Sequence, residues 1–243
     1  MRDFIRLLLL AGTIALAVNA KSARDTSPDA TSSYDWQLAK EASGVEVYTA
    51  DVAGSKFKIF KGVITLDTSM ASILGVLNDT SACSKWLYLC ERSEILELTS
   101  FSRRIIYQVN DMPFPVGDRD VVILALTSHE PDTGKFTITL ESRPDLYPIK
   151  KPVRIRISRG SYTLTPVADG RIEVIWQHFT DPAGSLRPFL VNALVEDVPL
   201  KSLANLKNLV ADEKYQALKI DYDEEGTPVG LIESNRTTAD VVR

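Results

Sequence analysis

Apolar and polar residues alternate over most of the chain between residues 45 and 180, and this pattern predicts β-strands. The predicted strands cover residues 45–51, 56–65, 91–98, 103–109, 120–127, 135–141, 152–165 and 171–180. Turn sequences at 131–134 and 168–170 separate neighbouring strands, so we expect an antiparallel meander. Residues 143–152, with three prolines, interrupt the meander as an irregular excursion.

Helical patterns flank and interrupt this strand region. Residues 34–42 predict a short helix. Residues 67–69 predict a helix start before the apolar run 70–78, and a second short helical piece is expected to carry Cys83 and Trp86. The longest predicted helix covers residues 186–219, and Pro199 is expected to kink or split it.

The order of these elements indicates an α+β fold in which one long helix covers a curved antiparallel sheet. No other predicted element is large enough to cover the sheet. One helix against a curved sheet leaves space that side chains do not fill, and ligand cavities form in such spaces. We therefore expect a hydrophobic cavity between the sheet and the helix.

The N-terminal residues read as an export signal. Arg2 and Arg6 precede an uncharged apolar run over residues 7–18, and small residues end at Ala20, where we expect cleavage. The alternative is a membrane anchor, but a helix of twelve residues spans only about 18 Å of a ~30 Å hydrocarbon core.

The predicted domain organisation follows from these patterns. Residues 1–20 are a signal peptide, residues 21–33 a disordered leader, and residues 34–219 one folded domain. Residues 220–243 contain an acidic patch and little pattern, which predicts a flexible tail. We expect the protein to be exported, periplasmic or secreted, and soluble after cleavage.

The charge balance limits the classes of partner. The chain has 243 residues, with 28 Lys and Arg against 32 Asp and Glu, a net charge of −4 and 44% hydrophobic residues. This composition is typical of a globular protein and excludes a wholly disordered chain. An acidic chain of this kind is not expected to bind nucleic acid.

The only two cysteines, Cys83 and Cys90, lie in one segment with six residues between them. An oxidising compartment permits a disulfide between them, which is the interpretation we favour. Two buried thiols are the alternative. A catalytic thiol needs a nearby base, and this segment has none.

Motifs of catalysis and metal binding are missing from the sequence. It holds two histidines, His129 and His178, and no zinc-ligand spacing, GxSxG elbow or phosphate-binding glycine loop. We expect no cofactor and no metal site. His129 precedes a turn and is expected to be solvated. His178 shares a strand face with Trp176 and is a candidate for the cavity wall, but the interpretation we favour is a hydrogen-bonded core or surface histidine.

The triplet Asp118, Arg119 and Asp120 allows two interpretations. The guanidinium of Arg119 has the geometry to bind a phosphate head group. The interpretation we favour is structural, with Arg119 paired to a local carboxylate at the start of a strand. Arg154 and Arg156 alternate with apolar residues, which places them on the solvated outside of the sheet.

The segment PFPVGDRDVV at residues 113–122 resembles the PWPVSDRDFV motif of the steroidogenic-acute-regulatory-related lipid-transfer (START) family. Further matching segments follow the family order, at residues 36–48, 60–62, 160–166, 181–186 and 192–206. Together they cover residues 36–209. The motif residues are Pro113, Phe114, Pro115, Asp118, Arg119 and Asp120.

The resemblance implies a helix-grip fold, in which a curved antiparallel sheet grips a C-terminal helix around a hydrophobic tunnel for one lipid. It also implies that residues 143–152 and 186–203 form the lid. Steroid-binding members carry a tunnel arginine six positions after the motif arginine. Here that position is Ala125, so this charged group is missing.

These observations support an exported carrier that holds one lipid or other hydrophobic molecule, contacts membranes transiently and is a monomer. The alternatives are an enzyme similar to the polyketide cyclases and a lipid-responsive sensor module. The candidate cavity residues are apolar, aromatic or imidazole side chains from the predicted strands and helices: Trp86, Tyr107, Ile123, Trp176, His178, Phe189, Leu190, Leu194 and Val198.

Overall fold

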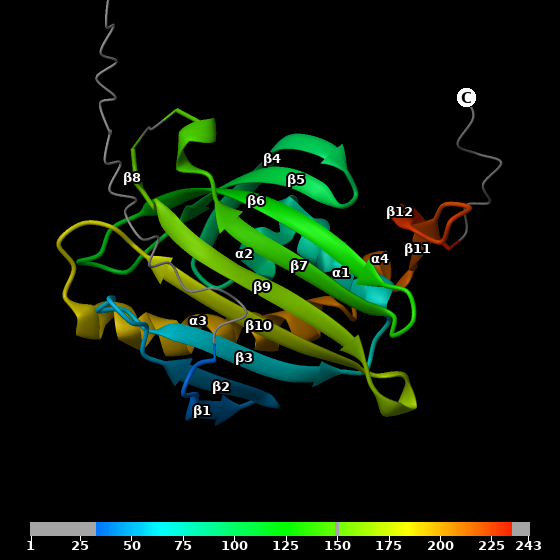
Figure 1. The fold of residues 1–243 in the computed structure, drawn as a ribbon, viewed down its shortest axis with the longest axis horizontal. Coiled ribbons are helices and arrows are strands. Elements are labelled where there is room, and N and C mark those ends of the chain that lie inside the picture. Colours follow the sequence, from blue (N-terminus) through cyan, green and yellow to red (C-terminus); the bar gives the residue numbers. More distant parts are fainter. Residues whose placement is uncertain (1–32, 149–150, 235–243) are drawn as a thin grey trace, which may run out of the picture.

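A curved, largely antiparallel sheet is the main feature of the fold in a computed structural model that describes residues 33–148 and 151–234 (Figure 1). Its strands are β1 (Gln37–Ala42), β2 (Val45–Ala50), β3 (Ile59–Leu66), β4 (Cys90–Ser100), β5 (Arg103–Asn110), β6 (Arg119–Glu130), β7 (Lys135–Ser142), β8 (Val153–Arg154), β9 (Ile157–Pro166) and β10 (Ile172–Asp181). They are ordered β1-β2-β3-β10-β9-β7-β6-β5-β4, and β8 adds a short parallel pairing to β6.

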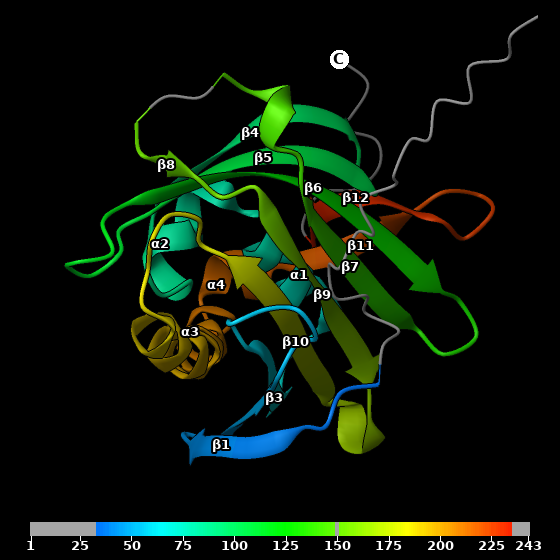
Figure 2. The ribbon, with the colours of Figure 1, turned by 60° about the vertical axis from the view of Figure 1, so that its left-hand side comes forward.

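The helices lie inside the curve of this sheet, as Figure 2 shows. They are α1 (Met70–Asn78), α2 (Cys83–Trp86), α3 (Pro188–Leu209) and α4 (Glu213–Gln216). Three short 3-10 turns, η1 (Thr80–Ala82), η2 (Pro144–Leu146) and η3 (Ala168–Gly170), complete the domain. The predicted α+β helix-grip architecture is confirmed.

Helix α3 packs closely against the sheet at Gly62 of β3. A Cβ atom at this position would lie 2.7 Å from Cδ1 of Leu203 and 3.0 Å from Cβ of Pro199. A residue without a side chain is therefore needed here. Leu203 and Leu206 are fully buried and join the main hydrophobic core between helix and sheet.

Several sequence-based predictions of local structure are confirmed. Ser69 caps α1, and its Oγ accepts a hydrogen bond of 3.0 Å from the backbone N–H of Ser72. The short helical piece with Cys83 and Trp86 is α2. The meander of strands runs as expected from β4 to β7 and on through β9 to β10.

The helix predicted over residues 34–42 is wrong. Residues 37–42 instead form β1, which pairs with β2 through a two-residue turn. Ser43 and Gly44 have φ values of 57° and 78°, the left-handed conformation that tight hairpin turns require. Gly44 therefore belongs to a hairpin turn.

The predictions for the C-terminal part also need correction. Helix α3 ends at Leu209 rather than residue 219 and is continuous across Pro199. Part of the expected tail, residues 220–243, is ordered, because β11 (Leu218–Tyr222) and β12 (Pro228–Glu233) form a hairpin. Residues 235–243 lie outside the described residues.

Tyr215 of α4 attaches this C-terminal part to α1. Its hydroxyl donates a hydrogen bond of 2.9 Å to Oδ2 of Asp79, which also pairs with Lys214. Burial raises the pKa of Asp79, but hydrogen bonds from Lys214, Ser81 and Tyr215 outweigh it and lower the pKa to about 2. The carboxylate is therefore charged at neutral pH and holds the hairpin region to the domain.

The strand predicted over residues 152–165 is two strands, β8 and β9, with a break before Ile157. The excursion at 143–152 is irregular over its described residues apart from η2. The predicted signal peptide, residues 1–20, and all but the last residue of the predicted leader lie outside the described residues. Within the described part, no helix is both long and apolar enough to cross a membrane.

Candidate functional site

A cavity of about 220 Å³ lies between the concave face of the sheet and α3. A single water needs only about 10–15 Å³ of such space, so the cavity is much larger than a packing defect. The side chains that line it are mostly apolar. They include Phe60, Ile106, Ile123, Ile138, Leu140, Tyr162 and Trp176 from the sheet, Trp86 and Leu87 beside α2, and Val191, Leu194, Val195 and Val198 from α3.

Most of the predicted cavity residues line this space. The structure places Trp86, Ile123, Trp176, His178, Leu194 and Val198 in its wall. Phe189 and Leu190 do not line it. Phe189 is 63% exposed, because it lies in the first turn of α3, beyond the edge of the cavity.

Tyr107, the remaining candidate, lies on the opposite face of the sheet. Alternate residues of β5 face opposite sides, and Tyr107 packs with Ile105 and Val109 on the outer face. Residues from the 143–148 segment cover it there, with the ring of Tyr147 4.9 Å away. The hydroxyl of Tyr107 donates a hydrogen bond to Oδ2 of Asp120 at 3.1 Å.

Aromatic rings form one wall of the cavity. Tyr162 and Trp176 stack with their centroids 5.1 Å apart, and Trp86 meets Tyr162 at 6.4 Å. Among the residues that the structure describes, the buried indole nitrogens of Trp86 and Trp176 have no hydrogen-bond partner. Buried polar atoms are usually bonded, so these two N–H groups are available as donors in the cavity wall.

His178 lies in this wall in its neutral form. Burial lowers its pKa to about 4, although part of the ring surface faces the cavity. Its Nε2 hydrogen bonds to the hydroxyl of Ser158 at 2.8 Å, whereas Nδ1 has no partner. A Cβ atom at Gly160 would lie 2.2 Å from Nδ1, so the neighbouring strand holds the ring in place.

Arg104 is a cavity residue that sequence reasoning missed. It lies on β5 and is 4% exposed. It pairs across the sheet with Ala125, the position at which the steroid-binding members carry their tunnel arginine. The family arginine is missing at Ala125, as the sequence shows, and Arg104 brings a guanidinium to the neighbouring position on β5. Burial lowers the pKa of Arg104 to about 10, so the group stays charged at neutral pH.

The motif segment forms the loop between β5 and β6 and the start of β6. Phe114 is 97% exposed, and Pro113, Pro115 and Asp118 are exposed as well. Arg119 is buried, but its partners differ from the predicted carboxylate. Its guanidinium donates to backbone carbonyl oxygens, including those of Gly117 and Pro182 at 2.7 Å each.

Arg119 therefore ties the motif loop to the segment that leads into α3. The buried carboxylate of this motif, Asp120, pairs instead with Arg154. The prediction that Arg154 lies on the solvated outside is wrong, since it is 5% exposed. Arg156 is exposed, as expected.

The sequence comparisons identify the fold family. The family model for the START domain matches residues 30–209, which is most of the chain. The chain belongs to the START family. An uncharacterized protein of Pseudomonas aeruginosa is 33% identical over 210 residues, covering 86% of this chain and 98% of the relative.

Named START relatives include lipid transfer proteins. Human phosphatidylcholine transfer protein is 24% identical over 206 residues, covering 81% of this chain and 94% of its own. A crystal structure of a STAR-related lipid transfer protein from Xanthomonas axonopodis shares 33% identity, with a TM-score of 0.67 over 73% of this chain and 99% of that chain. Human STARD10, at 20% identity, has the same fold, with a TM-score of 0.63 over 74% of each chain.

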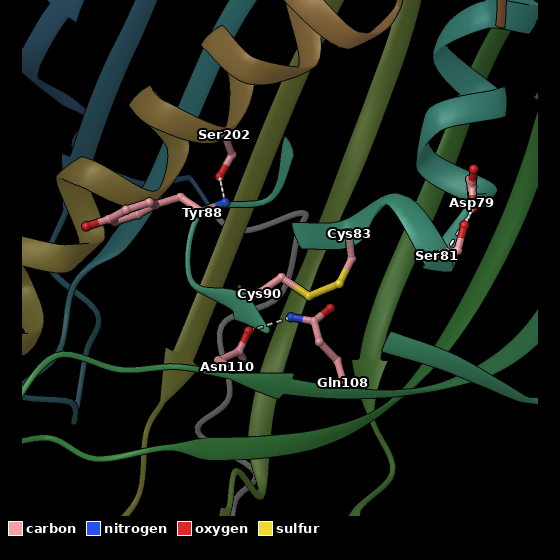
Figure 3. Close-up of a disulfide and its surroundings, with 8 residues drawn as sticks. All are labelled: Asp79, Ser81, Cys83, Tyr88, Cys90, Gln108, Asn110 and Ser202. Atoms are coloured by element: carbon pink, nitrogen blue, oxygen red, sulfur yellow. Dashed lines mark hydrogen bonds between the residues drawn. A yellow bond between two sulfur atoms is a disulfide. The ribbon is translucent and has the colours of Figure 1, made fainter. Parts of the chain in front are cut away.

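A disulfide joins Cys83 and Cys90 in this START domain, as the sequence predicted (Figure 3). It links α2 to the first residue of β4, and Cys83 also lines the cavity. The backbone N–H of Tyr88, inside the closed loop, donates to Oγ of Ser202 on α3 at 3.0 Å. The disulfide loop therefore supports α3 over the cavity.

Metal ligands do not cluster in the described part of this START domain. Over residues 33–148 and 151–234, no group of three or more His, Cys, Asp or Glu side chains could hold a metal ion. Of the two histidines, His178 is bonded within the cavity wall, and His129 stacks on Phe136 at 4.4 Å. His129 is thus half-buried rather than fully solvated.

Proposed function

We propose that this START protein binds one lipid in the cavity and carries it between membranes. The observation that carries the proposal is the large, mostly apolar cavity beneath α3 in a chain whose named relatives are lipid transfer proteins. Each buried methylene group contributes about 0.8 kcal/mol, so an acyl chain gains affinity from apolar contact alone. Catalysis is not part of the proposal.

Exchange of the lipid requires α3 to move. Its first half supplies Val191, Leu194 and Val198 to the cavity, whereas Leu203 and Leu206 in its second half are fixed in the core. A movement of the first half would open the cavity without unpacking the core. In the described part of residues 143–152, the other lid segment of the family, Tyr147 lies against Tyr107 on the outer face instead.

The apolar rim at one end of the molecule supports transient membrane contact. Phe114 projects from the β5–β6 loop, and Phe189 from the start of α3. Both elements lie at the same end of the sheet in Figure 1, joined by the hydrogen bonds of Arg119. Exposed aromatic side chains at one end of a cavity are suited to insertion into a lipid surface.

We further propose that the protein is exported and acts as a monomer in the periplasm or outside the cell. The apolar N-terminal sequence with Arg2 and Arg6 supports export. The disulfide between Cys83 and Cys90 is independent support, because such bonds persist in oxidising compartments.

Native mass spectrometry of the full-length gene product, purified from the exported fraction, tests this function. The expected result is a chain that begins at Lys21 and carries one extractable lipid per protein. A bare protein that takes up no fluorescent lipid would contradict lipid carriage. Turnover of a polyketide or ester would favour the enzyme, and a partner bound only in the loaded state would favour the sensor.

A further inference from the structure

Arg104 is a buried cation without a counterion. It is 4% exposed, and its Nε has no hydrogen-bond partner in the part of the chain that the structure describes. Burial is the only influence on its pKa, which means that no neighbouring carboxylate compensates the charge. A charge buried in this way destabilises a protein unless something pairs with it.

The surroundings of Arg104 leave room for such a partner. Its neighbours in register are Ala125 on β6 and Leu98 on β4, and neither carries a polar side chain. Ala125 has no atoms beyond Cβ and is fully buried. The guanidinium therefore lies beside a small residue in the wall of a cavity of about 220 Å³.

The Asp, Glu, Lys and His residues that line the cavity besides Arg104 are Lys58, Asp79 and His178, and none of them neutralises Arg104. Asp79 is the only carboxylate among them, and its oxygens are engaged by Lys214, Ser81 and Tyr215. His178 is neutral because its pKa is about 4. Arg104 thus contributes an uncompensated positive charge to an apolar space.

Arg104 is the charged residue that β5 contributes to a cavity whose lining is mostly apolar. Ile106, Gln108 and Asn110 follow Arg104 on the same face of β5, over about 20 Å at 3.3 Å per residue. Gln108 and Asn110 bond to each other at 2.7 Å, and most other lining residues are apolar. The wall matches a molecule with one charged end and a hydrophobic body.

We propose that Arg104 binds the anionic group of an amphipathic ligand, a carboxylate or a phosphate, whose apolar body fills the rest of the cavity. The planar guanidinium presents two N–H groups to two oxygens of such a group. This inference rests on the proposed lipid-binding function and narrows its ligand to an anionic amphiphile. A neutral sterol would leave the buried charge unpaired.

Titration of the delipidated full chain with four probes tests the assignment. Palmitate and palmitoyl lysophosphatidate carry the two candidate anions, hexadecanol is a neutral counterpart, and inorganic phosphate lacks an apolar body. In R104Q, we expect binding of the favoured anionic amphiphile to weaken about 10- to 100-fold. Hexadecanol binding should change less than threefold, and R104K should recover part of the loss.

The matched control is R103Q. Arg103 is the preceding residue on the opposite face of β5, where it pairs with Glu97 at 2.6 Å. R103Q should bind all four probes as the wild type does. If R104Q weakens palmitate binding more than lysophosphatidate binding, the ligand carries a carboxylate. If it weakens lysophosphatidate binding more, the ligand carries a phosphate, and either result supports the proposal.

The other outcomes overturn it in distinguishable ways. If no amphiphile binds the wild type, the proposed function fails as well. If R104Q binds palmitate, palmitoyl lysophosphatidate and hexadecanol as tightly as the wild type does, only the role of Arg104 fails. Inorganic phosphate that binds as tightly as the amphiphiles would also contradict the proposal.

The stability of the ligand-free protein gives an independent readout. Because Arg104 is unpaired, R104Q should raise the urea midpoint of unfolding or leave it unchanged. A lower midpoint in both R104Q and R104K would show that Arg104 stabilises the fold itself, which would overturn the binding role.

Discussion

Arg154 and Asp120 form a buried bidentate ion pair on the outer face of the sheet. Nε of Arg154 lies 2.8 Å from Oδ1 of Asp120, and Nη2 lies 2.9 Å from Oδ2. Nη1 of Arg154 also donates to the carbonyl oxygens of Pro144 and Tyr147. The pair thus attaches the irregular segment after β7 to the start of β6.

Loss of either partner should strongly destabilise the domain. D120N or R154M leaves a buried charge alone, which costs about 3–5 kcal/mol in the free energy of unfolding. The double variant should be more stable than the sum of the two single effects predicts, because it leaves no unpaired charge. Urea unfolding of all four proteins measures this coupling.

The control for this pair is R156M. Arg156 is exposed and its ion pair with Asp145 is 3.2 Å long, so its removal should cost less than about 1 kcal/mol. Strictly additive effects in the Arg154 and Asp120 cycle would contradict the buried pairing.

Local sequence signals predicted those elements whose two faces differ. In β10, buried residues alternate with more exposed ones, and the capping Ser69 marks the start of α1. The long helix was predicted because its apolar stripe repeats at helical spacing. Its end was not, because the apolar pattern continues past Leu209 into α4 and β11.

Strand β5 shows why the cavity wall was only partly predictable. Both of its faces are buried, one by the cavity and the other by the segment with Tyr147, so hydrophobicity cannot tell them apart. The apolar pattern favours the face with Tyr107 as the cavity wall, so Arg104 was not predicted there. The missing information was the pairing of Ile106 with Ile123, which places Ile106 and Arg104 on the cavity face.

The disulfide should contribute measurably to stability. For a closed loop of eight residues, from Cys83 to Cys90, the chain-entropy relation gives about 2.5 kcal/mol. The C83S/C90S double variant should therefore unfold at a lower urea concentration than the oxidised wild type. A reductant should lower the wild-type midpoint and leave the double variant unchanged. A fully reduced wild type with an unchanged midpoint would contradict this contribution.

His178 should make the stability depend on pH. Its pKa is about 4 in the folded protein and about 6.5 in the unfolded chain, so the unfolded state binds more protons between these values. The free energy of unfolding therefore falls as the pH falls from 6.5 to 4, by up to about 3 kcal/mol from this residue. Well above pH 6.5 the residue is neutral in both states and contributes no slope.

The measurement is urea unfolding of wild type and H178Q at several pH values. H178Q removes the titrating group, so its stability should fall less steeply with decreasing pH between 6.5 and 4. The carboxylates titrate in both proteins, so their contribution to the pH dependence cancels when the two slopes are compared. Parallel curves for the two proteins in this window would show that the imidazole keeps its ordinary pKa in the fold.

Phe114 and Phe189 should determine membrane binding. Burial of a phenylalanine side chain is worth about 1.5–3 kcal/mol, so F114S or F189S should weaken binding to phosphatidylglycerol vesicles about tenfold or more. Neither change should lower the thermal midpoint, because the two side chains are 97% and 63% exposed. L98S is the matched control. Leu98 is also 63% exposed, but it lies near the β4–β5 turn, away from the β5–β6 loop and the start of α3. Equal losses in L98S and the two phenylalanine variants would contradict a membrane-binding end, and sedimentation with the vesicles measures all four proteins.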